Sequence, residues 1–273
     1  MARPQRSRYC RDMSARRLAT AVAVCGLLFA NTAAADSPAP SIVAAGVVNA
    51  ATNQAALAPY SICSIYGADL YLNGTASASA NAQVPNQLGG LSVLIGITPA
   101  GLLYVSNNQI NILIPNSLAP GNFALRVIRD GVSSKSVPIT LQETAPGLFN
   151  GPTGFVAATH ADGSALTVNS PALPGEIVVL YGTGFGRTWP DPSDRAIAPG
   201  AGPIMHGADF RFLLDGNPID PALVQYVGLA PGYAGLYQIN VRLPDSVGAN
   251  PEVRVTVAGA VSAPGVRLPV ALP

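Results

Sequence analysis

The most informative stretch of this sequence is Glu176-Ile177-Val178-Val179-Leu180-Tyr181-Gly182. It is a short apolar run rich in β-branched residues and bounded by glycines, a composition typical of a β-strand. The same pattern occurs earlier in the chain as Ser61-Ile62-Cys63-Ser64-Ile65-Tyr66-Gly67. We therefore expect the same strand to occur twice.

Four further blocks of sequence recur in the same order around these two runs. They are residues 91–96 with 211–216, 109–115 with 238–244, 131–134 with 259–262, and 137–141 with 266–270. Chance supplies an isolated match but not a colinear set with similar spacing. The chain is therefore expected to contain two copies of one unit.

The blocks themselves predict strands with one face on a core. Phe123, Leu125 and Val127 alternate with residues of other character, as expected for the period of two in a β-strand. Several short strands per hundred residues, with no helical period between them, predict an all-β fold of two tandem immunoglobulin-like antiparallel β-sandwiches. The expected organisation is a signal peptide at 1–35, a first sandwich at 41–143, a Pro- and Gly-containing linker at 144–151 and a second sandwich at 152–273.

The composition agrees with this fold and excludes several functions. The chain holds 28 Gly and 25 Pro, which disfavour long helices, and only 11% of its residues are charged against 49% apolar. That balance does not suit a disordered acidic tail or a nucleic-acid binder. We expect no nucleic-acid partner.

The first 35 residues have the layout of a secretory signal. Six arginines come before an apolar run at 18–30, and small residues at 31–35 follow it. Cleavage after Ala35 removes six of the 15 basic residues and one of the 14 acidic ones, which leaves 9 basic and 13 acidic residues. The mature chain is then mildly acidic and has no apolar stretch long enough for a transmembrane span. We expect an exported protein located in the periplasm, at the cell surface or in the medium.

Several of these segments resemble known domains. The run from Pro174 to Gly186 resembles the opening of an IPT/TIG immunoglobulin-like domain, and together with the motifs at 145–149, 226–232 and 236–241 it is similar to a C-terminal-domain family of exported acidobacterial (Solibacter-type) proteins. The resemblance covers nearly all of residues 44–273 and implies an extracellular pair of β-sandwiches. It brings no established activity or catalytic residues, and IPT/TIG domains elsewhere occur in receptors, transcription factors and carbohydrate-active enzymes, so the fold does not select a function.

The segment from Arg187 to His206 is the candidate ligand-binding loop. It is long for a sandwich loop and contains the single tryptophan, Trp189, with Asp191, Asp194 and Arg195 close behind it. An indole stacks on a sugar ring and these charged groups bind its hydroxyls. The alternative is that Trp189 covers the end of the sandwich as a hydrophobic lid and the charges are only solvated.

Other polar positions are expected to be structural. Gln109 and Asn111 recur as Gln238 and Asn240, which suggests hydrogen bonds to neighbouring loop backbone rather than a ligand site. Cys63 aligns with Val178 and is expected to be a buried small hydrophobe. It is the only one of the three cysteines that remains after cleavage, so no intrachain disulfide is expected in the mature chain.

The sequence contains no recognisable catalytic or metal-binding motif. Neither His160 nor His206 lies in one, and no serine lies in a Gly-x-Ser-x-Gly elbow. We expect no catalytic residues, no metal and no cofactor. Three hypotheses follow: a non-catalytic interaction, adhesion or surface-assembly protein that contacts an extracellular protein; a carbohydrate-binding module that uses the Trp189 loop to bind polysaccharide; and, less favoured, an extracellular hydrolase.

Overall fold

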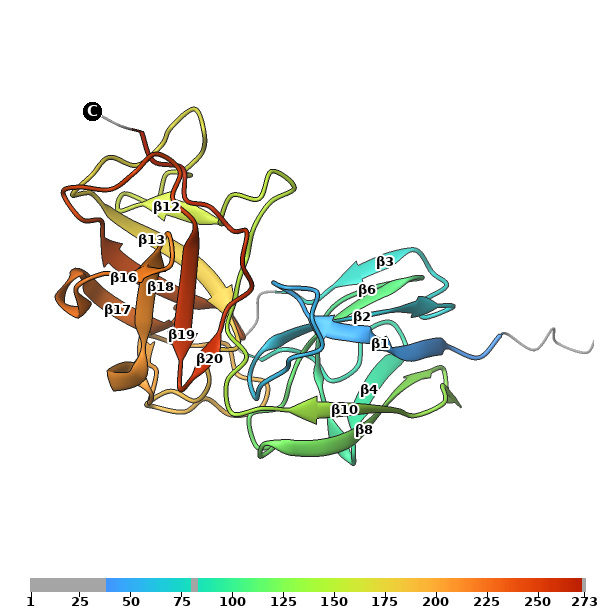
Figure 1. Ribbon diagram of the computed structural model, residues 1–273. Helices are drawn as coiled ribbons and strands as arrows, with labels where there is room; N and C mark the ends of the chain where they lie inside the picture. The colour runs from blue at the N-terminus through green and yellow to red at the C-terminus, as the bar shows by residue number, and fades with distance from the viewer. Residues whose placement is uncertain (1–37, 80–82, 272–273) are drawn as a thin grey trace, which may run out of the picture. The chain divides into compact units, whose positions relative to one another are not determined.

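The computed structural model describes residues 38–79 and 83–271, and within them the chain is built of β-strands with two short 3₁₀ helices (Figure 1). The strands of the N-terminal half are β1 (Ser41–Asn49), β2 (Ile62–Ala68), β3 (Thr75–Ser77), β4 (Leu91–Ile95), β5 (Thr98–Pro99), β6 (Gly101–Ser106), β7 (Gln109–Leu113), β8 (Gly121–Arg129), β9 (Val132–Ser133) and β10 (Val137–Leu141). The elements of the C-terminal half are β11 (Gly147–Leu148), β12 (Ala158–His160), β13 (Ile177–Thr183), β14 (Gly202–Pro203), η1 (Gly207–Asp209), β15 (Arg211–Leu214), β16 (Asn217–Pro218), η2 (Pro221–Leu223), β17 (Val224–Leu229), β18 (Tyr237–Arg242), β19 (Val253–Val257) and β20 (Ala260–Val261). The prediction of an all-β fold with antiparallel sheets is confirmed.

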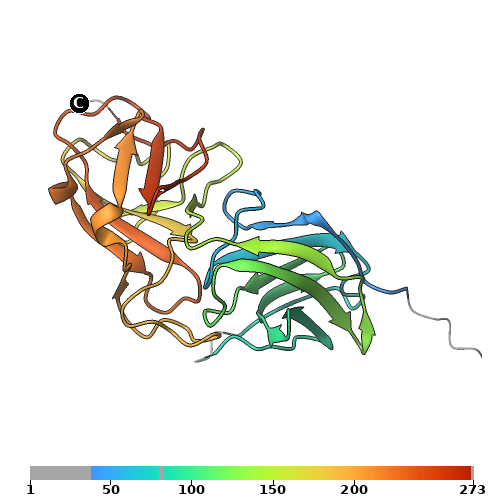
Figure 2. The ribbon, with the colours of Figure 1, turned by 60° about the horizontal axis from the view of Figure 1, so that its bottom comes forward.

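The N-terminal half contains two antiparallel sheets. One has the order β1-β2-β7-β6-β3, and the other has the order β10-β8-β4-β5 with β9 added to β8. Figure 2 shows the sheet of β8 and β10 lying over the sheet of β1, β2 and β7. Both sheets contribute side chains to one buried cluster, which includes Cys63 and Ile65 from the first and Val93 and Val127 from the second. The two sheets therefore share a core.

The C-terminal half repeats this arrangement. Its sheets have the orders β11-β13-β18-β17-β14, with β12 added to β13, and β16-β15-β19-β20. The strand β13 pairs with β18 as β2 pairs with β7, and β15 pairs with β19 as β4 pairs with β8. The repeated blocks of sequence thus occupy equivalent places in the two halves.

The tight turns recur as well. Asp130-Gly131 joins β8 to β9 with φ of 49° and 83°, and Ala258-Gly259 joins β19 to β20 with φ of 47° and 83°. Two consecutive left-handed residues match the twist of the hairpin strands, which explains a glycine at the second position of each turn. The same backbone conformation, two consecutive left-handed residues, therefore closes both hairpins.

Residues of the expected linker belong to the sheet. Gly147–Leu148 forms β11 and pairs with Thr183 and Gly182 of β13. Tyr60, Val84 and Leu113 of the N-terminal half join the hydrophobic cluster of the C-terminal half, and contacts group Pro38–Pro273 as one compact unit. The boundaries of two separate domains at 143 and 152 stay a prediction, and the expected signal peptide lies outside the described residues.

The two halves are connected by partly buried hydrogen bonds. The Thr183 hydroxyl accepts from the Ile62 amide at 2.9 Å and donates to the Gly235 carbonyl at 2.7 Å. The Tyr60 hydroxyl donates to the Ala196 carbonyl at 2.6 Å, and burial raises the pKa of Tyr60 to about 12, so the group stays a donor. These contacts hold the loop after β13 against the N-terminal half.

The polar residues of the repeat pair within their own strands. Gln109 donates from Nε2 to Oδ1 of Asn111 at 2.9 Å, and Gln238 donates in the same way to Asn240 at 3.2 Å. The amides therefore bind each other along the strand, where the sequence suggested loop backbone as the partner.

Cys63 is fully buried, and burial raises the pKa of its thiol to about 12. Since the thiolate is the reactive form of cysteine, Cys63 is a packing residue. Among the described residues no helix has the length and apolarity needed to cross a membrane.

Candidate binding face around Trp189

Trp189 is held on a short backbone ladder that the repeat did not predict. The segment leaving β13 runs antiparallel to residues 203–205, with a bridge between Thr188 and Ile204. The Trp189 amide donates to the Pro203 carbonyl at 2.9 Å, and the Met205 amide donates to the Arg187 carbonyl at 2.8 Å. The backbone under the indole is therefore fixed on both sides.

The ladder has a buried side and an exposed side. Thr188 and Ile204 are buried, and because successive residues of extended backbone point in opposite directions, their neighbours point outward. We call these outward residues, Arg187, Trp189, Pro203 and Met205, the Trp189 face. Trp189 is 75% exposed and Met205 is 62% exposed.

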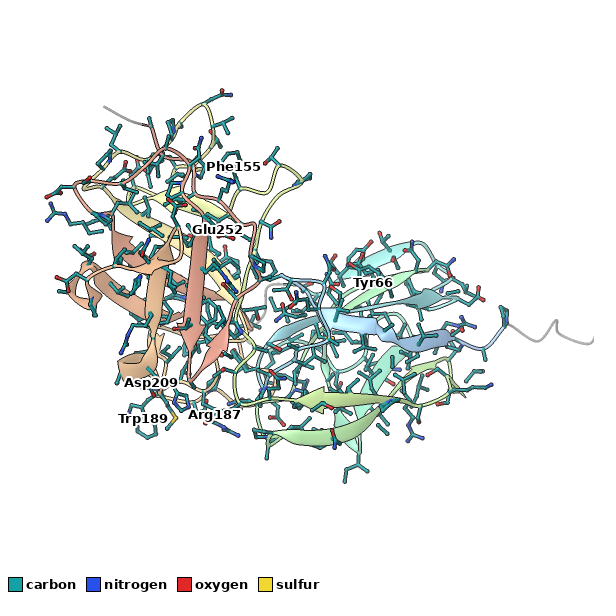
Figure 3. All side chains as sticks on the ribbon, viewed as in Figure 1. Tyr66, Phe155, Arg187, Trp189, Asp209 and Glu252 are labelled. Atoms are coloured by element: carbon teal, nitrogen blue, oxygen red, sulfur yellow. The ribbon has the colours of Figure 1, made fainter. Side chains whose placement is uncertain are left out.

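This exposure bears on the alternative interpretation of Trp189 as a hydrophobic lid. A lid over the end of the sandwich requires a buried ring, which does not fit an indole that is three-quarters exposed. Figure 3 shows Trp189 at the margin of the molecule, with Arg187 and Asp209 close to it. A large exposed aromatic on a fixed backbone is a feature of ligand-contacting surfaces.

Charged groups border the Trp189 face. The Arg187 guanidinium pairs with Asp191 at 2.5 Å. His206, next to Met205, lies 2.9 Å from Glu143 Oε1 and 3.9 Å from Asp209 Oδ2, and the side chains of both carboxylates are about two-thirds exposed. The apolar centre thus has hydrogen-bonding groups of both signs at its edge.

Asp194 and Arg195, which follow Trp189 in the chain, form hydrogen bonds within the protein. Asp194 accepts from the Ser117 amide at 2.6 Å and from the Ser117 hydroxyl at 2.8 Å. Arg195 donates from its guanidinium to the Val84 carbonyl at 3.1 Å, and its own carbonyl accepts from the Val84 amide at 2.8 Å. Asp194 and Arg195 therefore anchor the loop to the N-terminal half. They do not form a single group with Asp191 around the indole.

Replacing Asp194 by alanine is therefore expected to affect stability and not ligand contact. Two hydrogen bonds to Ser117 are lost at an exposed position, which should lower the free energy of unfolding by about 1 kcal/mol in urea titrations. Binding at the Trp189 face should stay within about twofold of the unmodified protein, since 1.4 kcal/mol corresponds to tenfold. A large loss of binding with unchanged stability would contradict the anchoring role.

The sequence did not identify Pro203, Met205 or Asp209 as neighbours of Trp189. Pro203 and Met205 approach it through the bridge between residues 188 and 204, a pairing that lies outside the repeated blocks and has no periodic signal. Asp209 lies at the border through its contact with His206. Pro203 also lines a groove of about 360 Å³ together with Phe210, Phe212 and Tyr226, and Arg211 and Gln225 add polar groups to its lining.

Comparisons with known proteins identify no family for this chain. No family model matches the sequence, and no curated protein matches it. Among solved structures, SGBP-B of the mixed-linkage glucan utilization locus of Bacteroides ovatus, in complex with a mixed-linkage heptasaccharide, aligns with TM-score 0.32 and 10% identity over 80% of this chain and 44% of that one. The surface glycan-binding protein PbSGBP-B of Prevotella bryantii aligns with TM-score 0.27 and 10% identity, over 77% of this chain and 36% of that one.

A third match is a γ-CGTase from alkalophilic Bacillus clarkii, with TM-score 0.27 and 15% identity over 86% of this chain and 26% of that one. The chain spans less than half the length of each of these three proteins. At such TM-scores none of their properties is transferred to this chain.

Proposed function

We propose that this protein is an exported glycan-binding protein that contacts polysaccharide through the Trp189 face. The observation that carries the proposal is the indole of Trp189, 75% exposed and fixed by main-chain hydrogen bonds on a two-segment ladder. An indole offers a flat apolar surface to the C–H face of a pyranose ring. Because the backbone beneath it is already ordered, little conformational entropy is lost when a ligand binds.

The border of the face supports the same function. Sugar rings carry hydroxyls on their edges, and these need donors and acceptors around the stacking surface. The carboxylates of Asp209 and Glu143 are acceptors. The guanidinium of Arg187 binds Asp191 and the Asn116 carbonyl, and its remaining N–H groups are donors for a ligand. Of the residues predicted for ligand binding, Trp189 carries the stacking surface and Asp191 pairs with Arg187 at its border. Asp194 and Arg195 instead bind Ser117 and Val84.

A protein partner is the second candidate. Met205 beside Trp189 favours it, since tryptophan and methionine are both enriched in protein interfaces. This candidate corresponds to an adhesion or surface-assembly role and uses the same residues. The two functions would use the same Trp189 face and differ in the ligand, which is a polysaccharide in one case and a protein in the other.

Replacing Trp189 by alanine is expected to weaken retention on polysaccharide by about tenfold or more, because the stacking surface is removed. The measurement is depletion of the mature protein by a panel of insoluble polysaccharides, together with a glycan array. Since the ring is exposed, the melting temperature should change by no more than about 1 °C.

Tyr233→Ala is the matched control, because this aromatic ring is also exposed, at 60%, and lies outside the Trp189 face. It should bind like the unmodified protein. If the unmodified protein is retained by no polysaccharide, or if Trp189→Ala binds as well as it does, glycan binding at this face is wrong.

A further inference from the structure

Three polar side chains of the C-terminal half form a chain of close contacts that the Trp189 face does not use. His160 Nδ1 lies 2.5 Å from Oε1 of Glu176, and His160 Nε2 lies 3.2 Å from the hydroxyl oxygen of Ser170. The order is hydroxyl, imidazole, carboxylate. This is the order in which a serine is activated for acyl transfer, with the histidine between a nucleophile and a carboxylate that orients it.

The fold fixes each member of this Ser170–His160–Glu176 group. His160 ends β12 and pairs with Val178 of β13, and Glu176 comes directly before β13. Oε2 of Glu176 accepts from the Leu173 amide at 2.9 Å, which orients the carboxylate. Residues that are ten and sixteen positions from His160 are thus brought to one place by strand pairing and a turn.

The turn that carries Ser170 is itself closed by hydrogen bonds. The Ser170 amide donates to the Thr167 carbonyl at 3.1 Å, and the Thr167 amide donates to the Ser170 carbonyl at 3.0 Å. The hydroxyl is exposed, whereas the side chains of His160 and Glu176 are 17% and 26% exposed. The nucleophile Ser170 is therefore accessible to solvent, whereas the base His160 is largely buried.

We propose that Ser170, His160 and Glu176 hydrolyse short-chain esters at this site. Ser170 Oγ attacks the ester carbonyl carbon while its proton passes to His160 Nε2. The C–O bond to the alcohol breaks, and the alcohol leaves with that proton, so an acyl group remains on Ser170. His160 then takes a proton from water, the hydroxide displaces the acyl group as a carboxylic acid, and the proton returns to Ser170.

The site lies in an open surface depression, and its lining indicates the class of ester. It has a volume of about 440 Å³ and is lined by His160, Ala161, Asp162, Ser164, Ser170 and Glu176. None of these residues is a large apolar side chain that holds a long acyl chain, and two are carboxylates. The site suits a small acyl group, such as acetyl, on a neutral hydrophilic alcohol such as a sugar, and disfavours anionic esters.

The protonation state of His160 gives the reaction a pH dependence. The hydrogen bond with Glu176 is the main cause that raises the pKa of His160 above its ordinary 6.5, and the charges of Glu176 and Asp162 raise it further. When protonated, Nε2 donates to the Ser170 carbonyl oxygen, which also lies 3.2 Å away. Only after it loses this proton does Nε2 accept the proton of the hydroxyl, so the rate should rise as pH rises through the raised pKa.

The test uses the mature chain with p-nitrophenyl acetate as substrate and a fluorophosphonate as a covalent probe of the serine. We expect steady hydrolysis, a fluorophosphonate adduct on Ser170 by mass spectrometry, and a loss of about 100-fold or more in Ser170→Ala and His160→Asn, the scale of general base catalysis. Ser133→Ala removes another exposed serine, in β9, and should keep full activity.

Glu176 acts as a positioning residue, and its variant separates catalysis from a structural role. In Glu176→Gln the carboxylate that raises the pKa of His160 is gone, so the pH at which the rate reaches half its maximum should fall along with the rate. Circular dichroism checks that each variant is folded. Absence of a Ser170 adduct on the folded unmodified protein, or equal hydrolysis by unmodified protein and Ser170→Ala, would overturn the proposal.

Discussion

Replacing Thr183 by valine is expected to lower the free energy of unfolding by about 3 kcal/mol. Thr183 is the last residue of β13 and is fully buried. Its hydroxyl accepts from the Ile62 amide and donates to the Gly235 carbonyl, whereas valine keeps the shape and offers neither bond. Two main-chain groups lose a hydrogen-bond partner at the junction of the two halves, and each costs about 1 to 3 kcal/mol when buried without one.

Urea titration of the protein measures this effect as a lower transition midpoint. Thr183→Ser is the matched control, because it keeps the hydroxyl and removes only a buried methyl group, at about 1 kcal/mol. If the valine and serine variants are equally stable, the two hydrogen bonds are not what holds this junction.

Replacing Gly184 by alanine is expected to destabilise the protein by a similar amount, about 3 kcal/mol. Gly184 has φ of 79°, a left-handed conformation that costs an alanine about 1 to 2 kcal/mol. An added Cβ would also overlap the carbonyl oxygen of Ala145, whose own amide donates to the Gly184 carbonyl at 2.8 Å. The atoms that the added Cβ would overlap belong to the Ala145 backbone, and these cannot yield as the end of a flexible side chain can.

Gly163→Ala separates the cost of the left-handed backbone conformation from the cost of the overlap with Ala145. Gly163 has φ of 86°, nearly the same as Gly184, but an added Cβ would meet nothing within 4 Å. This variant should lose only the conformational part, about 1 kcal/mol, in the same urea titration. Equal losses at both positions would show that the close approach to Ala145 contributes nothing.

Both predicted losses lie where β13 passes into the segment that carries Trp189. Thr183 and Gly184 hold that segment against Ile62, Gly235 and Ala145, and the Trp189 ladder begins three residues after Gly184. The glycine-rich run at 182–186 is therefore needed for close packing of backbone, and Phe185 within it stacks at a tilt on Tyr237 with ring centroids 5.2 Å apart.

Much of the fold could be predicted from the repeat because strands leave a local signal. The runs at 61–67 and 176–182 give β2 and β13. The same period of two is seen in β19, where Val253, Val255 and Val257 are fully buried. Cys63 follows the same logic, since its alignment with Val178 indicated a core position and both side chains are fully buried. Side-chain period and β-propensity act within a few residues, so they are visible without coordinates.

The surroundings of the candidate sites had no such signal. Asp191, Asp194 and Arg195 follow Trp189 in the chain, yet Asp194 binds Ser117 and Arg195 binds Val84. Trp189 instead lies opposite Pro203 on the ladder, with Met205 on the same face. His160, Ser170 and Glu176 meet only because β12 pairs with β13 and a turn returns the chain to them.

The sequence by itself determined that the chain forms β-strands, in two repeated sets, with one face of each on a core. Only the tertiary structure decided that Trp189 is exposed, which charges surround it and which serine stands against His160. The physical reason is the distance along the chain over which each interaction acts. Strand formation follows from the pattern of neighbouring side chains, whereas a site is made by hydrogen bonds between segments far apart in the chain, and their partners are chosen by how the sheets pack.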